Sequence, residues 1–290
     1  MSMPAIFEGR NGAVAVKCGY AATRLGQLHY RSCGDGLPVI LLSAAGRSSR
    51  MFANLMPRLS AEFRLIAFDT PGFGASGPLP TGVGIEEIAL AFFDAMDQIG
   101  INRSAIYGLH TGNKIATAMA VAHPARVTKL ILAGQSHSLI PSQAQRNAAI
   151  VDLIRDYVAL PGVSTSKPSS KLNILLELLR LFGRDGHHPQ LGGSLSDHLL
   201  DELEATGTSA LYQANLTYDL GQGFSQIRVP TLVLEIATPL ETAQIGLQGK
   251  VVTSMIPGSS LTTFQDADSD GLTLENRVED LADLIVAFLS

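Results

Sequence analysis

A turn that leads from a strand into a helix constrains the fold of this chain more than any other feature. Residues 106–112 read Ile-Tyr-Gly-Leu-His-Thr-Gly, so that Gly108 and Gly112 flank His110 symmetrically. Glycines at these positions allow the backbone to turn sharply between the strand and the helix. The sequence therefore predicts a tight corner centred on His110.

Strand and helix patterns alternate on both sides of this corner. Alternating apolar and polar residues at 13–17 and 22–30 predict two antiparallel strands at the start. Buried strands and helices then follow one another, at 37–43, 51–59, 63–68, 85–99, 105–107, 114–122 and 127–133. Such alternation implies right-handed crossovers and an α/β fold with a doubly wound, mostly parallel sheet, whose ligands bind at the carboxyl ends of the strands.

The alternation stops after residue 138. Several helical patterns, among them 148–160 and 171–182, are interrupted by Gly, Pro and Ser and contain no buried strand. Strand patterns return at 229–235 and 261–265, before a last helix at 277–289, a set of elements that continues the earlier sheet. The sequence therefore predicts one α/β domain with a helical insertion.

Composition limits the class of protein. A chain of 290 residues with 46% hydrophobic residues can bury a full core, and a net charge of −5 offers no basic surface for nucleic acid. Two cysteines, Cys18 and Cys33, are too few for a disulfide framework, and we expect both to be buried thiols in a reducing compartment. No apolar run approaches the roughly 20 residues of a membrane span, so we expect a soluble, cytoplasmic protein without a membrane partner.

Four segments, in order, resemble the α/β-hydrolase superfamily. Residues 39–46 are similar to its strand and oxyanion loop, and 68–76 to its next strand and turn. The corner at His110 is similar to its nucleophile elbow, and 229–240 with 261–289 to its last two strands and closing helix. The resemblance implies an α/β-hydrolase-type sheet with the insertion acting as a helical lid.

This resemblance divides the chain into three parts. We expect the first part of the core at 1–138, the lid at 139–224 and the second part of the core at 225–290. The lid falls where many members of the superfamily carry one.

The resemblance also implies a serine, histidine and acid triad, and none of its members stands at its usual position. His110 replaces the serine, Thr238 occupies the acid position, and the loop at 266–271 carries aspartates where histidine is usual. The usual His-Gly of the oxyanion loop is replaced by Ser43 and Ala44.

Several residues could still support chemistry at the corner. The backbone amides of Thr111 and Ala45 are the predicted oxyanion donors, since Thr111 begins a helix beside the presented side chain. Imidazole exchanges a proton near neutral pH, so His110 could be a general base or a nucleophile. It would need an orienting carboxylate, for which Glu235 and the loop residues Asp268 or Asp270 are candidates.

Other polar residues lie near the predicted strand ends. His137 and Ser136 follow a strand end at the lid boundary, so His137 is a candidate catalytic residue and Ser136 a candidate substrate contact. Asp69 is interpreted as structural. The remaining five histidines are interpreted as structural: His187 and His188 in a Gly/Pro-rich stretch of the lid, and His29, His123 and His198, which are expected to have no partners.

Cofactor and metal sites are not predicted. The run from Gly72 to Gly77 matches a dinucleotide fingerprint, but Pro78 and Pro80 prevent the helix that would hold a pyrophosphate. The aspartates at 266–271 resemble half a calcium loop, yet the twelfth position carries a basic residue instead of glutamate. A transition metal held by the candidate residues has no diagnostic spacing; these residues are His110, His137, Asp270 and Glu235.

Two functions from different classes remain. The first is a small-molecule hydrolase or lyase that cleaves an ester, a lactone or a carbon–carbon bond next to a ketone, using His110. Aromatic and leucine side chains of the lid predict an apolar or aromatic substrate, contacted by Ser43, Ser136 and Tyr212. The second is an inactive member that binds a ligand or a protein. A third hypothesis is a hydrolase whose nucleophile is Ser43, Ser48 or Ser136, with His110 as the base. Whether the protein forms a homodimer is left open.

Overall fold

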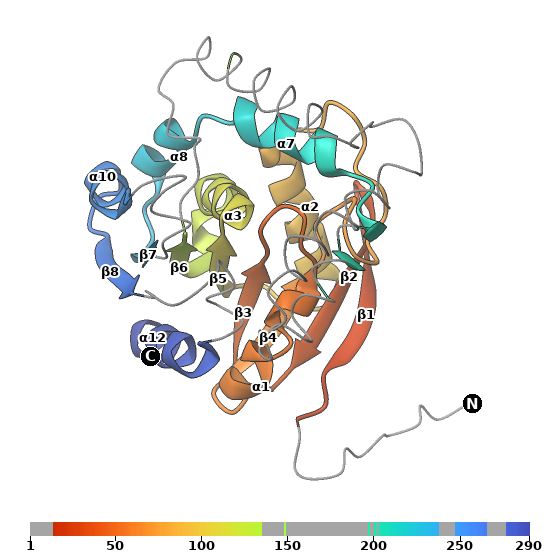
Figure 1. Cartoon of the computed structure of the whole chain (residues 1–290). Coiled ribbons are helices and arrows are strands. Elements are labelled where there is room, and N and C mark those ends of the chain that lie inside the picture. Colours follow the sequence, from red (N-terminus) through yellow and green to blue (C-terminus); the bar gives the residue numbers. More distant parts are fainter. Residues whose placement is uncertain are drawn as a thin grey trace, which may run out of the picture.

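The computed structural model describes residues 14–134, 148, 197, 200, 201, 203–237, 247–265 and 277–290. These residues form one eight-stranded sheet in the order β1-β2-β4-β3-β5-β6-β7-β8 (Figure 1). The strands are β1 (Lys17–Thr23), β2 (Gly26–Cys33), β3 (Leu37–Leu42), β4 (Phe63–Phe68), β5 (Ser104–Leu109), β6 (Val127–Ala133), β7 (Thr231–Ala237) and β8 (Ser260–Gln265).

The sheet is parallel from β4 to β8, and only β1 and β2 are antiparallel to their neighbours. The predicted doubly wound, mostly parallel sheet is therefore confirmed. Chain order reverses between the neighbouring strands β3 and β5. In an open α/β sheet such a reversal leaves a crevice at the carboxyl ends of the two strands, where ligands bind. The loops after β3 and β5 are the segments that this topology brings to that crevice.

Helices cover both faces of the sheet. They are η1 (Ser49–Phe52), α1 (Leu55–Leu59), α2 (Ile85–Gln98), α3 (Thr111–Ala122), η2 (Pro124–Arg126), α7 (Thr208–Thr217), α8 (Leu220–Gln226), α10 (Gly249–Met255) and α12 (Val278–Leu289). One apolar core lies between the sheet and α2, α3, α7, α8 and α10, and a second lies between the other face and η1, α1 and α12. Successive side chains of a strand point to opposite faces of the sheet, so each strand contributes to both cores. In β3, Ile40 and Leu42 lie in the first core, and Val39 and Leu41 lie in the second.

The N-terminal strands differ from their predicted positions. Residues 14–16 are not in a strand, and β1 begins at Lys17. The predicted strand at 22–30 spans the hairpin turn between β1 and β2, where Gly26 has a φ of +98°. Apolar alternation continues across this tight turn, so the pattern alone gave the wrong boundaries. The predicted strands from residue 37 onward lie within two residues of the observed ones.

The two cysteines differ in exposure. Cys33 is buried, which raises the pKa of its thiol to about 11. Cys18 is exposed on β1, so the expectation that both thiols are buried was wrong. Cys18, Tyr20 and Ala22 alternate along β1 and are all exposed, so this face of the strand points to solvent.

No helix within the described ranges is both long enough and apolar enough to cross a membrane. The predicted lid helices at 148–160 and 171–182 lie outside the described residues, apart from position 148. From the predicted lid, the structure describes α7 and α8 and a few residues before them.

Candidate active site

The corner between β5 and α3, residues 108–112, has the geometry expected from its two glycines. A side chain on Gly108 would meet the carbonyl oxygen of Gly112 at 2.4 Å, and one on Gly112 would meet the carbonyl oxygen of Leu42 at 2.3 Å. Neither approach leaves room for a Cβ atom. Glycine is therefore required at both ends of the corner because strand, turn and neighbouring strand touch through their backbones.

His110 has an unusual backbone conformation. Its φ is +50° and its ψ −104°, and no other non-glycine residue in the described ranges has a positive φ. The His110 amide donates to the carbonyl of Ala133 at 3.1 Å, and the His110 carbonyl accepts from the amide of Asn113 at 3.0 Å. These bonds fix the corner to β6 and to the first turn of α3. The imidazole is partly exposed rather than sealed in the core.

Thr111 and Ala45, the predicted oxyanion donors, follow the neighbouring strands β5 and β3, and their role stays a prediction. Thr111 is the first residue of α3, and the first amides of a helix have no acceptor within that helix. Ala45 lies in the loop after β3, the strand next to β5. The hydroxyl of Ser43 donates to the carbonyl of Arg47 at 3.1 Å and closes this loop. Ser43 thus shapes the loop in addition to its predicted role as a substrate contact.

Helix α7 packs against the start of α3. The Asn215 side-chain amide donates to the Thr111 hydroxyl at 2.7 Å, and both residues are buried. Tyr212, the predicted substrate contact from the lid, is partly buried one turn earlier on α7. The described part of the predicted lid therefore reaches the corner through α7.

Glu235 lies at the carboxyl end of β7, and both of its oxygens have partners there. Oε2 accepts from the amide of Gly249, and Oε1 accepts from the hydroxyl of Thr263 at 3.0 Å. The Gly249 bond is 2.6 Å long and holds the first residue of α10. The orientation of His110 by Glu235 stays a prediction, and the contacts seen are those of a residue that joins β7, β8 and α10.

Five residues of the sequence-predicted site lie outside the described residues: Ser136, His137, Thr238, Asp268 and Asp270. Within the described ranges, no three His, Cys, Asp or Glu side chains are grouped as metal ligands.

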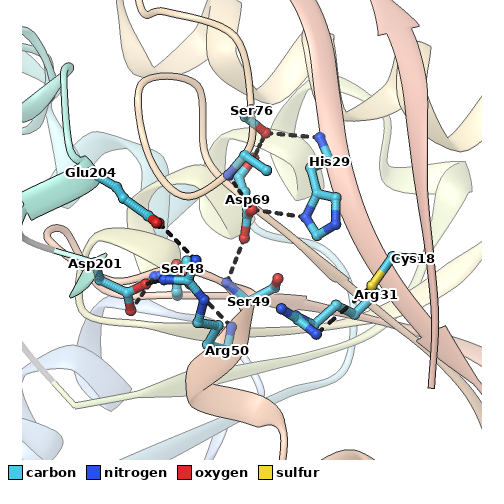
Figure 2. Close-up of polar contacts among 12 residues, drawn as sticks. Cys18, His29, Arg31, Ser48, Ser49, Arg50, Asp69, Ser76, Asp201 and Glu204 are labelled. Carbon is cyan, nitrogen blue, oxygen red and sulfur yellow. Dashed lines mark hydrogen bonds and ion pairs between the residues drawn. The ribbon is translucent and has the colours of Figure 1, made fainter. Parts of the chain in front are cut away.

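Asp69 is the centre of a buried polar group that we call the Asp69 cluster: Asp69, His29, Ser49, Ala75 and Ser76. The carboxylate contacts His29 Nδ1 at 2.9 Å and accepts from the amides of Ser49 at 2.6 Å and Ala75 at 2.9 Å (Figure 2). Ser76 accepts from the His29 amide at 2.9 Å and donates to the Asp69 carbonyl at 2.8 Å. This arrangement connects β2, β4 and the loops after β3 and β4.

Two sequence interpretations can now be compared with the Asp69 cluster. His29 was expected to have no partner, and this was wrong because it contacts Asp69, which is 40 positions away in the sequence. Burial alone would raise the pKa of the Asp69 carboxyl, but hydrogen bonds from His29, Ser49 and Ala75 outweigh it and lower that pKa. Asp69 thus has the contacts of a structural carboxylate. His123 also has a neighbour, since its ring lies edge-on to Phe93.

A second polar group, the Asp201 cluster, joins the predicted lid to the loop after β3. It consists of Arg47 together with four residues labelled in Figure 2, namely Asp201, Glu204, Ser48 and Arg50. Asp201 accepts from the Ser48 amide at 3.0 Å, from Arg47 Nε at 3.3 Å and from Arg50 at 2.9 Å. Arg50 also donates to Glu204 at 2.7 Å. Sequence reasoning missed this cluster because its two halves are more than 150 residues apart.

Lys114 is the other residue that sequence reasoning missed. It lies in the first turns of α3 with 3% of its surface exposed, and burial lowers the pKa of its amine to about 7. A signal was available: a single lysine directly precedes a run of small and mostly apolar residues, Ile115 to Ala122. The sequence interpretation used Lys114 only as the start of a helix.

Comparison with known proteins agrees with this fold. The protein family described as alpha/beta hydrolase fold matches residues 38–236. The 2-hydroxy-6-oxononadienedioate/2-hydroxy-6-oxononatrienedioate hydrolase 2 of Pseudomonas putida is 26% identical over 254 residues, 83% of this chain and 84% of that protein. The 2-hydroxy-6-oxo-6-phenylhexa-2,4-dienoate hydrolase of Comamonas testosteroni is 34% identical over 115 residues, 37% of this chain and 39% of that protein.

Two solved structures illustrate the likeness in fold. A hydrolase from Pseudomonas aeruginosa superposes with a TM-score of 0.74 at 22% identity, covering 94% of this chain and 98% of that one. The enol-lactonase from Burkholderia xenovorans superposes with a TM-score of 0.67 at 18% identity, covering 93% of this chain and 99% of that one. At these identities the superpositions concern the fold.

Proposed function

Because the chain belongs to the α/β-hydrolase fold family, we propose that it is a small-molecule hydrolase whose site is built around His110 instead of a serine. The reaction is hydrolytic cleavage of an ester, a lactone or a carbon–carbon bond next to a ketone. The observation that carries the proposal is the backbone of His110, with a φ of +50° at the corner between β5 and α3.

This conformation is costly for a side chain. A non-glycine residue at positive φ typically costs about 1–3 kcal/mol, and such residues gather at functional sites. Glycine would relieve the strain, whereas here a proton-exchanging side chain occupies the position and is partly exposed. A strained imidazole at the carboxyl end of a parallel sheet supports a catalytic role for His110.

The named relatives support the reaction class. They are hydrolases, and by name they act on 2-hydroxy-6-oxo dienoates. The enol-lactonase shares the fold. We transfer from them the chemistry of attack on a carbonyl carbon, with an apolar or aromatic small molecule as the substrate class.

His110 would act as a general base. Its imidazole takes a proton from water while the water oxygen bonds to the carbonyl carbon, and the carbonyl electron pair moves onto its oxygen. The amides of Thr111 and Ala45 donate to that oxyanion. When the carbonyl re-forms, the bond to the alkoxide or enolate leaving group breaks, and the imidazolium returns its proton to that group. The products are a carboxylic acid and an alcohol or ketone.

A second route has His110 as the nucleophile. Its nitrogen then bonds to the carbonyl carbon and expels the leaving group, and water releases the acid from the acyl-imidazole. A burst of leaving group in rapid-mixing experiments indicates this route, and its absence indicates the general base. In either route we propose Glu235, Asp268 or Asp270 as the group that orients the imidazole. We propose His137 as a further catalytic residue, and Ser43, Ser136 and Tyr212 as substrate contacts.

The test compares the wild type with His110→Asn. Asparagine tolerates a positive φ, so this variant removes the base while keeping the corner. Hydrolysis of para-nitrophenyl acetate and para-nitrophenyl benzoate should fall by about a hundredfold or more, the usual size of a general-base contribution. Unfolding monitored by circular dichroism shows that both proteins are folded. Equal rates above the buffer rate in the two proteins would contradict the proposal.

The alternative function is an inactive family member that binds a ligand or a partner protein. The contacts of Glu235 favour it, because both oxygens of this candidate orienting group already bind Gly249 and Thr263. Absence of turnover with esters, lactones and cleavable diketones, together with a small molecule that co-purifies with the folded wild type, would support this alternative.

A further inference from the structure

We propose that Lys114 is an anion-binding residue of this site and that the ligand carries a carboxylate group next to the part that meets His110. The proposal rests on the proposed function only for the position of the reacting group. The presence of a carboxylate subsite can be tested without any turnover.

The position of Lys114 follows from its neighbours on α3. Thr111, three residues earlier, contacts Asn215 of α7. Thr117, three residues later, lies against Gly223 of α8, where an added Cβ atom would be 2.9 Å from the Thr117 methyl group. Residues three apart are neighbours on one face of a helix. Lys114 therefore lies between these two contacts, on the face of α3 that α7 and α8 cover.

The direction of the side chain brings its amine toward the corner. In an α-helix the Cα–Cβ bond tilts toward the N-terminus, and a long side chain covers the preceding turn. For Lys114 the preceding turn is Thr111 with His110. This end of α3 already carries the partial positive charge of the helix dipole. A lysine at this place increases an anion-attracting potential instead of offsetting it.

Lys114 and two polar atoms on neighbouring residues have no partner among the described residues. Only 3% of the Lys114 surface is exposed, and no carboxylate of the described residues pairs with it. The Thr117 hydroxyl and Asn215 Oδ1 are also buried without a hydrogen bond to any described residue. By contrast, the buried Arg47 and His29 each contact a carboxylate, those of Asp201 and Asp69. Lys114 thus differs from the other buried basic residues named here in having no described carboxylate beside it.

A carboxylate ligand would supply the missing charge. Burying an ammonium group without a counter-ion is unfavourable. Buried titratable groups of this kind are concentrated at functional sites. The lowered pKa of Lys114 agrees with this, since burial disfavours the ammonium form and no described carboxylate offsets the effect. A carboxylate at the corner would favour the ammonium form and bind through it.

The experiment measures the binding of benzoate and of benzamide, two ligands of the same shape with and without the charge. Isothermal titration is performed on the wild type and on Lys114→Met, which keeps the length of the side chain and removes its amine. Sodium chloride at matched ionic strength controls for general salt effects. Lys114→Arg keeps a positive charge and serves as the second variant.

We expect benzoate to bind the wild type about tenfold or more tightly than it binds Lys114→Met, and benzamide to bind both proteins equally weakly. Lys114→Arg should retain part of the preference for benzoate. The proposal is overturned if benzoate does not bind the wild type, if it binds Lys114→Met equally well, or if benzamide matches benzoate. Loss of turnover in His110→Asn bears on the proposed function instead, so the two proposals can fail separately.

Discussion

The Asp69 cluster and the corner with Lys114 are both buried polar regions at the carboxyl ends of strands, yet their polar groups are satisfied in opposite ways. The two oxygens of Asp69 accept from two backbone amides and contact His29. At the corner, His110 has a strained backbone, and Lys114 is buried without a described carboxylate. Charge-assisted hydrogen bonds make the first region a source of stability. The second region costs stability, a trade-off that is common where activity needs a strained or destabilised site.

The largest loss in the free energy of unfolding is expected for Asp69→Asn. This change removes a buried charge that three donors face, and it should lower the free energy of unfolding by about 3 kcal/mol or more. Asp94→Asn is the matched control, because the Arg24–Asp94 ion pair is largely exposed and typically contributes under about 1 kcal/mol. Urea unfolding followed by circular dichroism measures both. Equal losses in the two variants would contradict the comparison.

The stability difference between wild type and Asp69→Asn should also depend on pH, in a direction that the pKa of Asp69 fixes. The folded pKa of Asp69 is lowered from an ordinary value of 3.8, so its contribution is complete above that value and is lost as the pH falls through the folded pKa. The stability difference between wild type and Asp69→Asn should therefore stay constant near neutral pH and shrink below about pH 4. A difference that grows in acid would contradict the assignment.

An effect of opposite sign, a gain in stability, is expected for Lys114→Met. The folded pKa of Lys114, about 7, lies below the ordinary 10.5, so the unfolded chain binds a proton that the folded one does not between these values. Lys114 therefore costs stability progressively as the pH falls from about 10 to about 7, and the cost is complete below about 7. Lys114→Met should be the more stable protein at pH 7, with an advantage that shrinks at higher pH. Thermal unfolding at several pH values checks this, and a less stable Lys114→Met at pH 7 would contradict it.

The smallest change in the free energy of unfolding is expected for Glu235→Gln. The amide keeps an acceptor for Gly249 or Thr263, so the loss in unfolding free energy should be about 1–2 kcal/mol. If Glu235 only joins β7, β8 and α10, hydrolysis rates should stay within about threefold of the wild type. A rate loss comparable to that of His110→Asn, with little loss of stability, would instead place Glu235 with the imidazole.

Most of the fold could be predicted because buried parallel strands are continuous apolar runs. The strands at 63–68 and 127–133 were located to the residue by this signal. The edge strands β1 and β2 were misplaced, since half-exposed strands show only alternation and the hairpin turn did not interrupt it. Helix α10 was missed, because its seven residues are too few for a clear helical period.

The candidate site was predicted less completely. The corner was predicted because its motif, a residue flanked by glycines two positions away on each side, lies within a few consecutive residues. The partners of Asp69 and Asp201 come from distant segments, and nothing in the local sequence near His29 or Arg47 reveals them. Lys114 was overlooked because its meaning depends on burial, and burial at this position is set by α7 and α8, which come a hundred residues later.

The most direct test of the central claim, that His110 moves the proton, is to titrate its imidazole by NMR and to measure kcat/KM for ester hydrolysis over the same pH range. Spectra of His110→Asn identify the resonance. The account predicts that activity rises with the fraction of neutral imidazole and that the two midpoints coincide. An imidazole that titrates while kcat/KM stays constant, or a rate that changes at a different pH, would contradict it.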